Sequence, residues 1–280
     1  MGKLASTARG LVRASHPAPT VAVTVLAVAM LVGMGAQSSM LALAAGAVLA
    51  GQLSVGWSND WLDVARDRAV QRTSKPIVAG LLTAATVRTA ALVAVGVCVA
   101  LSWATGLLAG TVHLVAVAAA WGYNAGLKAT VLSWLPYAVS FALLPAYLVL
   151  VTPGPALAPL WLMAAGALLG VGAHLANVLP DFADDAATGI RGLPHRLGRR
   201  VSAVLAPALL AAATLVVLLG PGDAGGFNAA GAGLALALAL GAGVVGATRQ
   251  RSRVPFVLSM GVAAVCVVLL ATAGPRIVAG

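Results

Sequence analysis

Acidic side chains are scarce in this 280-residue sequence, which contains no glutamate and only seven aspartates. Charged residues of all kinds make up 9% of the chain, whereas soluble domains usually contain about a quarter. Aromatic residues make up only 5%, but apolar residues as a whole reach 61%. The core of a soluble domain cannot bury this much apolar surface, so we expect lipid to surround most of the protein.

Cysteine is also nearly missing. The two thiols, Cys98 and Cys266, each lie inside an apolar run and outside any CxxC or Cys/His pattern. We expect both to be small side chains of the core. Cysteine therefore gives no sign of a metal site or of a redox compartment.

Apolar runs of about 20 residues, each long enough to cross a bilayer, recur along the chain. Nine spans are expected, at residues 18–36, 40–57, 79–100, 106–123, 134–151, 157–177, 200–220, 228–247 and 254–273. Breakers at 153–155 and 221–223 and polar stretches at 58–78 and 178–200 separate some of them. The first run has no small-residue cleavage site, so we expect a span rather than a signal peptide. The prediction is an all-α, polytopic membrane protein with one membrane-embedded domain over residues 1–280.

Basic residues fix the expected orientation. With nine spans and a cytoplasmic N-terminus, every Lys and Arg except Arg88 and Arg276 falls in a segment on the cytoplasmic side. The C-terminus is then outside, and a bacterial cell would carry the protein in its cell membrane. The net charge of +10 reflects this bias. It favours contact with membrane lipid and gives no reason to expect nucleic-acid binding.

Six of the seven aspartates lie in two short clusters. They are Asp60, Asp63 and Asp67 in the first cluster and Asp181, Asp184 and Asp185 in the second. The first three are spaced i, i+3 and i+7, and Asp181 and Asp185 are one turn apart, so helices place each set on one face. Both clusters follow spans that end on the cytoplasmic side, and we expect them to face the same membrane surface.

Carboxylates that share a helix face repel one another, so such a face needs cations. An oxygen-only ligand set without His or Cys suits Mg²⁺, which takes one or two carboxylates and completes its shell with water and phosphate. The alternative without a metal site is that the aspartates are solvated loop charges paired with arginines, namely Arg66, Arg68, Arg191 and Arg196. Two clusters with helical spacing in a chain almost free of acids favour the metal site.

These segments resemble the UbiA superfamily of intramembrane prenyltransferases, which includes membrane terpene cyclases. The first cluster, read with Asn59, matches the superfamily's NDxxDxxxD motif at every defined position, and Asp181 and Asp185 match its DxxxD motif. Residues 72–80, the Tyr123-to-Lys128 segment and residues 189–198 resemble the stretches that accompany these motifs. The resemblance is close over residues 55–200. For the rest of the chain it rests on the number of expected helices alone.

The resemblance implies a helical bundle around a central cavity, with a site for Mg²⁺ and an isoprenyl diphosphate at the cytoplasmic side. The implied metal ligands are Asn59, Asp60, Asp63, Asp67, Asp181, Asp184 and Asp185, and the implied catalytic residues among them are Asp63, Asp67, Asp181 and Asp185. The implied diphosphate-binding residues are Arg72, Lys75, Lys128, Arg191 and Tyr123. Three features depart from the family pattern. Lys75 stands where Arg is common, Ala129 follows Lys128 where Arg is frequent, and Asp184 adds a charge inside the second motif.

The expected reaction is ionisation of an allylic prenyl diphosphate and transfer of the prenyl group to an aromatic or prenoid acceptor. The alternative is a terpene cyclase, in which a double bond of the same chain captures the cation. No distinct catalytic base is visible, and His174 is expected to be a buried structural residue. A transporter is the third hypothesis, and it is disfavoured because the spans lack ionisable residues near their centres, Arg88 being the exception.

Overall fold

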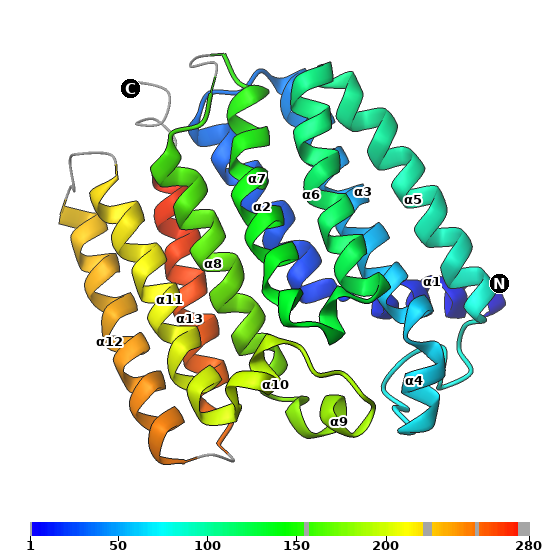
Figure 1. The fold of residues 1–280 in the computed structure, drawn as a ribbon. Helices are drawn as coiled ribbons and strands as arrows, with labels where there is room; N and C mark the ends of the chain where they lie inside the picture. Colours follow the sequence, from blue (N-terminus) through cyan, green and yellow to red (C-terminus); the bar gives the residue numbers. More distant parts are fainter. Residues whose placement is uncertain (1, 154–156, 221–225, 250–251, 274–280) are drawn as a thin grey trace.

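The computed structural model describes residues 2–153, 157–220, 226–249 and 252–273, and every regular element within these ranges is helical. Figure 1 shows long helices running side by side, with several short helices at one end. The long ones are α2 (Pro17–Gly33), α3 (Ser38–Leu62), α5 (Ala84–Ala104), α6 (Leu107–Ala125), α7 (Leu135–Leu150), α8 (Leu160–Val178), α11 (Arg199–Leu219), α12 (Gly226–Thr248) and α13 (Val254–Thr272). The predicted all-α fold is confirmed. Asp223, Arg251, Arg276 and most of the breakers at 153–155 and 221–223 lie outside the described residues.

Eight of the described helices are long and apolar enough to cross a bilayer by themselves. A ninth span arises if α1 (Gly2–Ala14) and α2 count as one, although the two are bent by 70° at their junction. The predicted number of nine spans is therefore approximately right. The first span is the irregular one, because α1 lies crosswise to the bundle in Figure 1.

Two helix boundaries differ from the prediction in a way that matters for the aspartate clusters. Helix α3 continues to Leu62, five residues beyond the expected end of that span, and so carries the start of the first cluster. Helix α5 begins at Ala84 rather than residue 79, because the Thr83 hydroxyl accepts a hydrogen bond from the Thr86 amide at 3.0 Å and caps the helix. The polar segments between spans also contain short helices that the apolar pattern did not predict.

The short elements gather at one end of the bundle. They are α4 (Val64–Ala69), η1 (Leu127–Ala129), η2 (Val131–Trp134), α9 (Phe182–Ala187) and α10 (Leu193–Leu197). Figure 1 places α4, α9 and α10 at the lower end of the bundle. This end carries both aspartate clusters.

Six long helices form a closed ring. Going round, α2 packs against α3, α3 against α6, α6 against α7, α7 against α8, and α8 against α13, which returns to α2. Helix α5 packs outside α3 and α6, and helices α11 and α12 pack outside α8 and α13. The ring brings segments distant in sequence to one end of the bundle.

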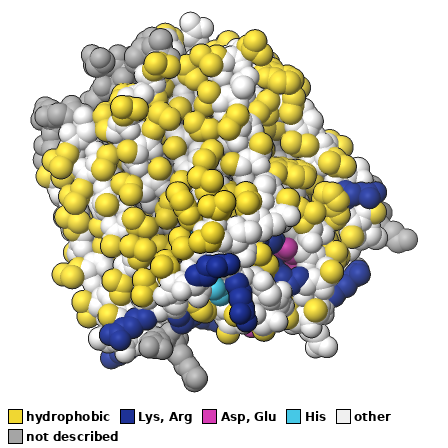
Figure 2. All heavy atoms as spheres, in the orientation of Figure 1, with side chains coloured by type: hydrophobic (Ala, Val, Ile, Leu, Met, Phe, Trp, Pro, Cys, Tyr) yellow, Lys and Arg dark blue, Asp and Glu magenta, His cyan; other side chains and the backbone are white. Residues whose placement is uncertain are grey.

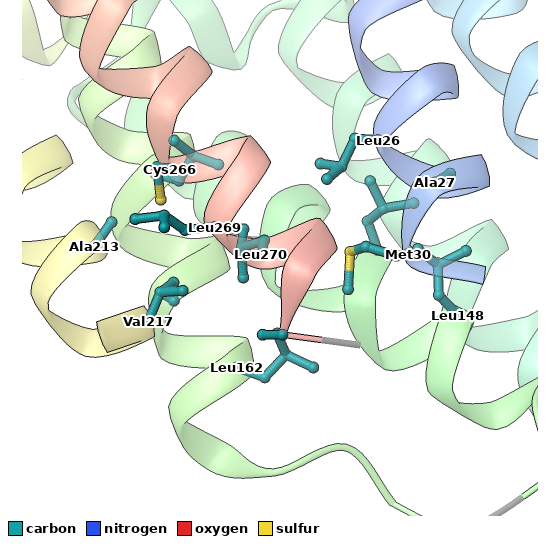
Figure 3. Packing of buried hydrophobic residues seen from close by; sticks show 14 of the residues in the cluster. Leu26, Ala27, Met30, Leu148, Leu162, Ala213, Val217, Cys266, Leu269 and Leu270 are labelled. Atoms are coloured by element: carbon teal, nitrogen blue, oxygen red, sulfur yellow. The ribbon is translucent and has the colours of Figure 1, made fainter. Parts of the chain in front are cut away.

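The largest hydrophobic cluster among the described residues lies in the half of the bundle away from the aspartate clusters. Figure 3 shows Leu26 and Met30 of α2, Leu148 of α7, and Leu162 of α8 in one packed group with α11 and α13. Each of these side chains is buried. The predicted core positions of the two cysteines are confirmed, since both thiols are free and buried.

The outer surface of the bundle is apolar. Figure 2 shows hydrophobic side chains covering most of one face, with basic side chains along its lower edge. Exposed residues include Leu107, Leu160 and Leu240, each more than two thirds exposed. A continuous apolar face of this extent is stable in a bilayer rather than in water.

Candidate functional site

The first aspartate cluster straddles the junction of α3 and α4. The helical hydrogen bonds continue across it, because the Asp63 amide donates to the Asn59 carbonyl at 3.0 Å and the Asp67 amide to the Asp63 carbonyl at 2.8 Å. Asn59, Asp63 and Asp67 therefore follow one another at single-turn intervals, as their spacing predicts. All three aspartates of the cluster are buried.

Asp63 lies at the centre of a hydrogen-bonded group. Its Oδ2 accepts a hydrogen bond from Arg66 Nη2 at 2.9 Å and another from Asn59 Nδ2 at 3.2 Å. Its Oδ1 forms an ion pair with Lys128, which comes from η1. Asn59 also donates to Asn124 of α6, at 3.2 Å. The group ties α3, α4, α6 and η1 together at one point.

Asp67 is buried but not fully partnered. Its side chain is 2% exposed, and its Oδ1 makes no hydrogen bond within the described part of the chain. The guanidinium nitrogens of Arg66 and Arg72 lie 3.7 and 3.8 Å from this oxygen, which is close enough for attraction but too long for a hydrogen bond. A buried carboxylate oxygen in this state is open to a further cation.

Asp60 belongs to a separate group. Its Oδ1 accepts a hydrogen bond from Lys75 Nζ at 2.5 Å and lies 3.0 Å from His16 Nε2. His16 occupies the bend between α1 and α2, where its backbone has a left-handed φ of 52°. Asp60 thus joins the bend, α3 and the loop before α5. Lys75 hydrogen-bonds to Asp60, and its positive charge also acts on Asp67.

The second cluster lies at the start of α9, where Asp181 precedes the helix and Asp185 is in its first turn. The Asp185 amide donates to the Asp181 carbonyl at 2.9 Å, so the expected one-turn spacing is present. Asp181 is 44% exposed and Asp185 only 16%. Asp184 is exposed, and its side chain makes no ion pair with the described residues.

Two arginines join the clusters. Arg72 Nη2 donates to Asp181 Oδ2 at 2.5 Å although the two residues are 109 positions apart in the sequence. Arg66 lies 2.9 Å from Asp63, 3.7 Å from Asp67 and 3.8 Å from Asp185. The two clusters therefore share one set of cations. Arg191, by contrast, is exposed and makes no ion pair in the part of the chain that is described.

Burial changes the proton affinity of the groups outside the spans. It raises the pKa of the Asp67 and Asp185 carboxyls above the ordinary value of 3.8, against the opposing charges of nearby basic residues. It lowers the pKa of the Lys128 ammonium, which Asp63 partly offsets. Burial also acts to lower the pKa of Arg72. The hydrogen bond to Asp181 and the negative charge of that carboxylate outweigh burial, so the pKa of Arg72 is raised.

Aromatic side chains line the bundle next to the clusters. Tyr123 of α6 contacts Tyr137 of α7 edge to face, with ring centroids 5.1 Å apart. His174 of α8 lies 4.8 Å from Tyr137 and 5.6 Å from Tyr123, centroid to centroid. His174 is 1% exposed and its Nε2 is 3.0 Å from Ser133 Oγ. A carbocation formed near these ring faces would be stabilised by them.

The geometry includes three residues that the sequence analysis did not assign to the site. Arg66 contacts both clusters, Asn124 holds Asn59, and His16 holds Asp60. The i, i+3 spacing between Asp63 and Arg66 was a usable signal, and Asn124 lies inside the Tyr123-to-Lys128 segment. His16 had no such signal, because it lies 44 positions from Asp60.

The residues fit a divalent cation that arrives with a phosphate ligand. No three Asp, His or Cys side chains among the described residues form a ready-made metal site. The donors are oxygens alone, and the unpartnered Asp67 Oδ1 is the observation that supports the fit. Mg²⁺ usually needs only one or two carboxylates, since water and substrate phosphate supply the other ligands.

Comparison with known proteins gives a consistent result. A family model described as the UbiA prenyltransferase family matches residues 21–265. No curated protein matches the sequence. Among solved structures, a UbiA homologue from Archaeoglobus fulgidus bound to GPP and Mg²⁺ has a TM-score of 0.72 at 14% identity, covering 97% of this chain and 100% of that one.

Two further structures share the fold. A UbiA homologue from Aeropyrum pernix K1 has a TM-score of 0.70 at 19% identity, covering 88% of this chain and 94% of that one. The other comes from work on digeranylgeranylglyceryl phosphate synthase in membranes. It has a TM-score of 0.68 at 15% identity, covering 99% of both chains. The fold and the apolar surface define an integral membrane protein built from a helical bundle. More particularly, the chain belongs to the UbiA prenyltransferase family.

Proposed function

We propose that this protein is a Mg²⁺-dependent intramembrane prenyltransferase that ionises an allylic isoprenyl diphosphate. The observation that carries the proposal is the position of Arg66, within 4 Å of carboxylates from both aspartate clusters. Membership of the UbiA prenyltransferase family supports the reaction class. The structural relatives bound to GPP or DMAPP with Mg²⁺ support the substrate class and the metal.

The charges of the site suit a diphosphate with two divalent ions. Four carboxylates, those of Asp63, Asp67, Asp181 and Asp185, face three cations, those of Arg66, Arg72 and Lys128. Two Mg²⁺ and a trianionic diphosphate together would add one positive charge and bring this group to neutrality. Asp60 and Lys75 neutralise each other nearby. The bound metal supplies Lewis acidity that stabilises the departing diphosphate.

Most of the predicted site residues have a role in this proposal. Asn59, Asp63, Asp67, Asp181 and Asp185 hold Mg²⁺, with Asp60 as a supporting residue. Asp184, which the sequence analysis included among the ligands, is exposed and has no role in this proposal. The basic residues exchange their carboxylate partners for diphosphate oxygens when substrate and metal enter, because charge-assisted hydrogen bonds to phosphate replace those to carboxylate. Arg66, Arg72 and Lys128 already pair with carboxylates of the clusters. Lys75 pairs with Asp60, whereas Arg191 is exposed. The proposed diphosphate-binding residues are therefore Arg66, Arg72, Lys75, Lys128 and Arg191.

The prenyl chain is proposed to extend into the bundle past Tyr123 and Tyr137, whose rings stabilise the allylic cation. Capture of that cation by a lipophilic acceptor, aromatic or prenoid, completes the transfer. In a terpene cyclase the same rings would guide an internal double bond to the cation. Products decide between the two, since a cyclic hydrocarbon or alcohol formed from a prenyl diphosphate alone identifies a cyclase.

Neighbouring aspartates with different environments provide the test. Asp185→Asn removes a carboxylate that is 16% exposed and close to Arg66, whereas Asp184→Asn changes an exposed one. We expect Asp185→Asn to lower Mg²⁺-dependent diphosphate release by about 100-fold and Asp184→Asn to change it little. Purified protein is incubated with geranyl, farnesyl or geranylgeranyl diphosphate, with Mg²⁺ or with EDTA.

Two outcomes would contradict the proposal. One is full diphosphate release in EDTA by metal-free protein. The other is unchanged turnover in both Asp185→Asn and Asp63→Ala, in protein that unfolds at the same temperature as wild type.

A further inference from the structure

A second group of basic side chains lies at the end of the bundle that carries the aspartate clusters, but on other helices. Arg199 and Arg200 begin α11, and Arg249 directly follows α12. These three residues, with Ser252 and Leu179 among others, line a shallow pocket that has room inside for about one water molecule, so a larger ligand would lie at its mouth. None of the described residues that line it is acidic. The pocket is therefore strongly positive.

The charges of this pocket differ from those of the aspartate site. There, Arg66, Arg72 and Lys128 each have a carboxylate partner. Here, neither Arg200 nor Arg249 makes an ion pair with any residue that the structure describes. Like charges around one pocket repel one another, and a bound anion would remove the repulsion.

The helices hold the arginines in place around the pocket. Arg199 Nη1 donates to the Leu179 carbonyl at 2.5 Å, and its guanidinium lies 6.0 Å from the centroid of the Phe182 ring. Helices α11 and α12 approach closely at the pocket, because a Cβ on Gly246 would lie only 2.8 Å from the Ala203 carbonyl oxygen. This close contact between α11 and α12 fixes the spacing of the helix ends that carry the arginines.

Apolar surface leads away from the pocket. On α11, Val204 lies one turn beyond Arg200 on the same face and is 39% exposed. In Figure 2, basic side chains lie along the lower edge of an apolar face. An anion with an apolar tail matches both surfaces.

We propose that the mouth of this pocket binds the phosphate of an anionic membrane lipid, with the acyl chains along α11. Guanidinium groups bind phosphate oxygens through paired hydrogen bonds. The Ser252 hydroxyl adds a further polar group to the lining of the pocket. Basic pockets between spanning helices bind anionic headgroups in this way. The site is additional to the prenyl diphosphate site and needs no prenyl substrate.

The test compares two double variants with the same charge change. Arg200→Gln with Arg249→Gln alters the pocket, whereas Arg9→Gln with Arg88→Gln alters two exposed arginines of α1 and α5. Phosphatidylglycerol or phosphatidylcholine is titrated into detergent-purified protein, and the bound lipid is counted by native mass spectrometry. We expect the pocket variant to lose about 30-fold in affinity for phosphatidylglycerol and the control variant to keep wild-type affinity.

Three results would overturn the proposal. The first is wild-type protein that binds phosphatidylcholine as tightly as phosphatidylglycerol, which needs no variant to establish. The second is an equal loss of affinity in both double variants, which would assign the effect to general surface charge. The third is displacement of phosphatidylglycerol by inorganic phosphate at equal concentration, which would make the ligand a free anion rather than a lipid. None of these results bears on prenyl transfer, because no prenyl diphosphate is present.

Discussion

At the scale of single residues, the aspartates of one motif have unlike environments. Asp63 has three hydrogen-bonding or ion-pair partners. Asp67 and Asp60 each have one buried oxygen without a hydrogen bond, but the other oxygen of Asp60 pairs with Lys75 in a separate group. Asp184 and Asp185 are neighbours in sequence but differ in exposure. The role proposed for each residue follows from these differences and not from the motif alone.

The raised pKa values of Asp67 and Asp185 predict how pH affects metal binding. A proton and Mg²⁺ compete for the same oxygens, and burial makes these carboxyls take up the proton at a pH above that of an ordinary aspartate. We therefore expect the Mg²⁺ concentration for half-maximal diphosphate release to rise as the pH falls. The rise should be up to about tenfold per pH unit for each carboxyl that protonates.

The measurement is a Mg²⁺ titration at a series of pH values from about 7 down to about 4. Asp184→Asn should leave the profile unchanged, because that carboxylate is exposed. A half-saturating Mg²⁺ concentration that stays constant down to about pH 4 would contradict the assignment of Asp67 and Asp185 as ligands.

At the scale of helices, the contact between α7 and α8 positions the aromatic residues beside the clusters. Gly166 and Gly170 of α8 face the α7 backbone, where an added Cβ would lie 2.2 Å from the Phe141 carbonyl oxygen and 2.4 Å from that of Tyr137. Glycines four residues apart allow two spanning helices to approach this closely. The position of Tyr137 against His174 depends on that approach.

Gly170→Ala is expected to push α7 away from α8. The added methyl group should cost about 1–3 kcal/mol of stability and lower turnover as well, because Tyr137 moves with its helix. Gly243→Ala in α12 is the matched control, since no atom lies within 4 Å of the position that an added Cβ would take and alanine favours the helix. Thermal unfolding in detergent and diphosphate release measure the two effects. Equal stability of the two variants would show that the α7–α8 contact tolerates the methyl group.

At the scale of the whole molecule, the ring of helices has two unlike ends. Both aspartate clusters and most basic residues lie at one end, and the packed core lies in the other half. The bias of Lys and Arg supports a cytoplasmic position for the aspartate end and for the N-terminus, with the C-terminus outside. This orientation is a proposal for the single membrane-embedded domain.

Cysteine labelling tests the orientation, because the native Cys98 and Cys266 are buried. Ala187→Cys places a thiol at an exposed position of the aspartate end, and Gln37→Cys places one at an exposed position of the other end. In sealed right-side-out vesicles, a membrane-impermeant maleimide should label Gln37→Cys and leave Ala187→Cys unlabelled until the membrane is opened. The reverse pattern would invert the proposed topology.

The spans and the two aspartate clusters were predictable from the sequence. Apolar runs of bilayer length identify helices without knowledge of their neighbours, since a helix satisfies its own backbone hydrogen bonds. The aspartates stood out because the chain contains so few acids. The end of α3 was placed five residues too early because the apolar run stops near Trp57, although the spacing of Asp60, Asp63 and Asp67 already indicated a helix there.

Only the tertiary structure decided which cations meet which carboxylates. Arg66, Arg68 and Arg72 are alike in sequence, yet Arg66 and Arg72 reach the second cluster while Arg68 is exposed. That outcome depends on α8 packing against α7 and on the closure of the helix ring, which bring segments 109 positions apart into contact. Composition and spacing are local properties that determined the spans and the motifs. Ion pairing depends on distance in space, which only the packing of the whole bundle sets.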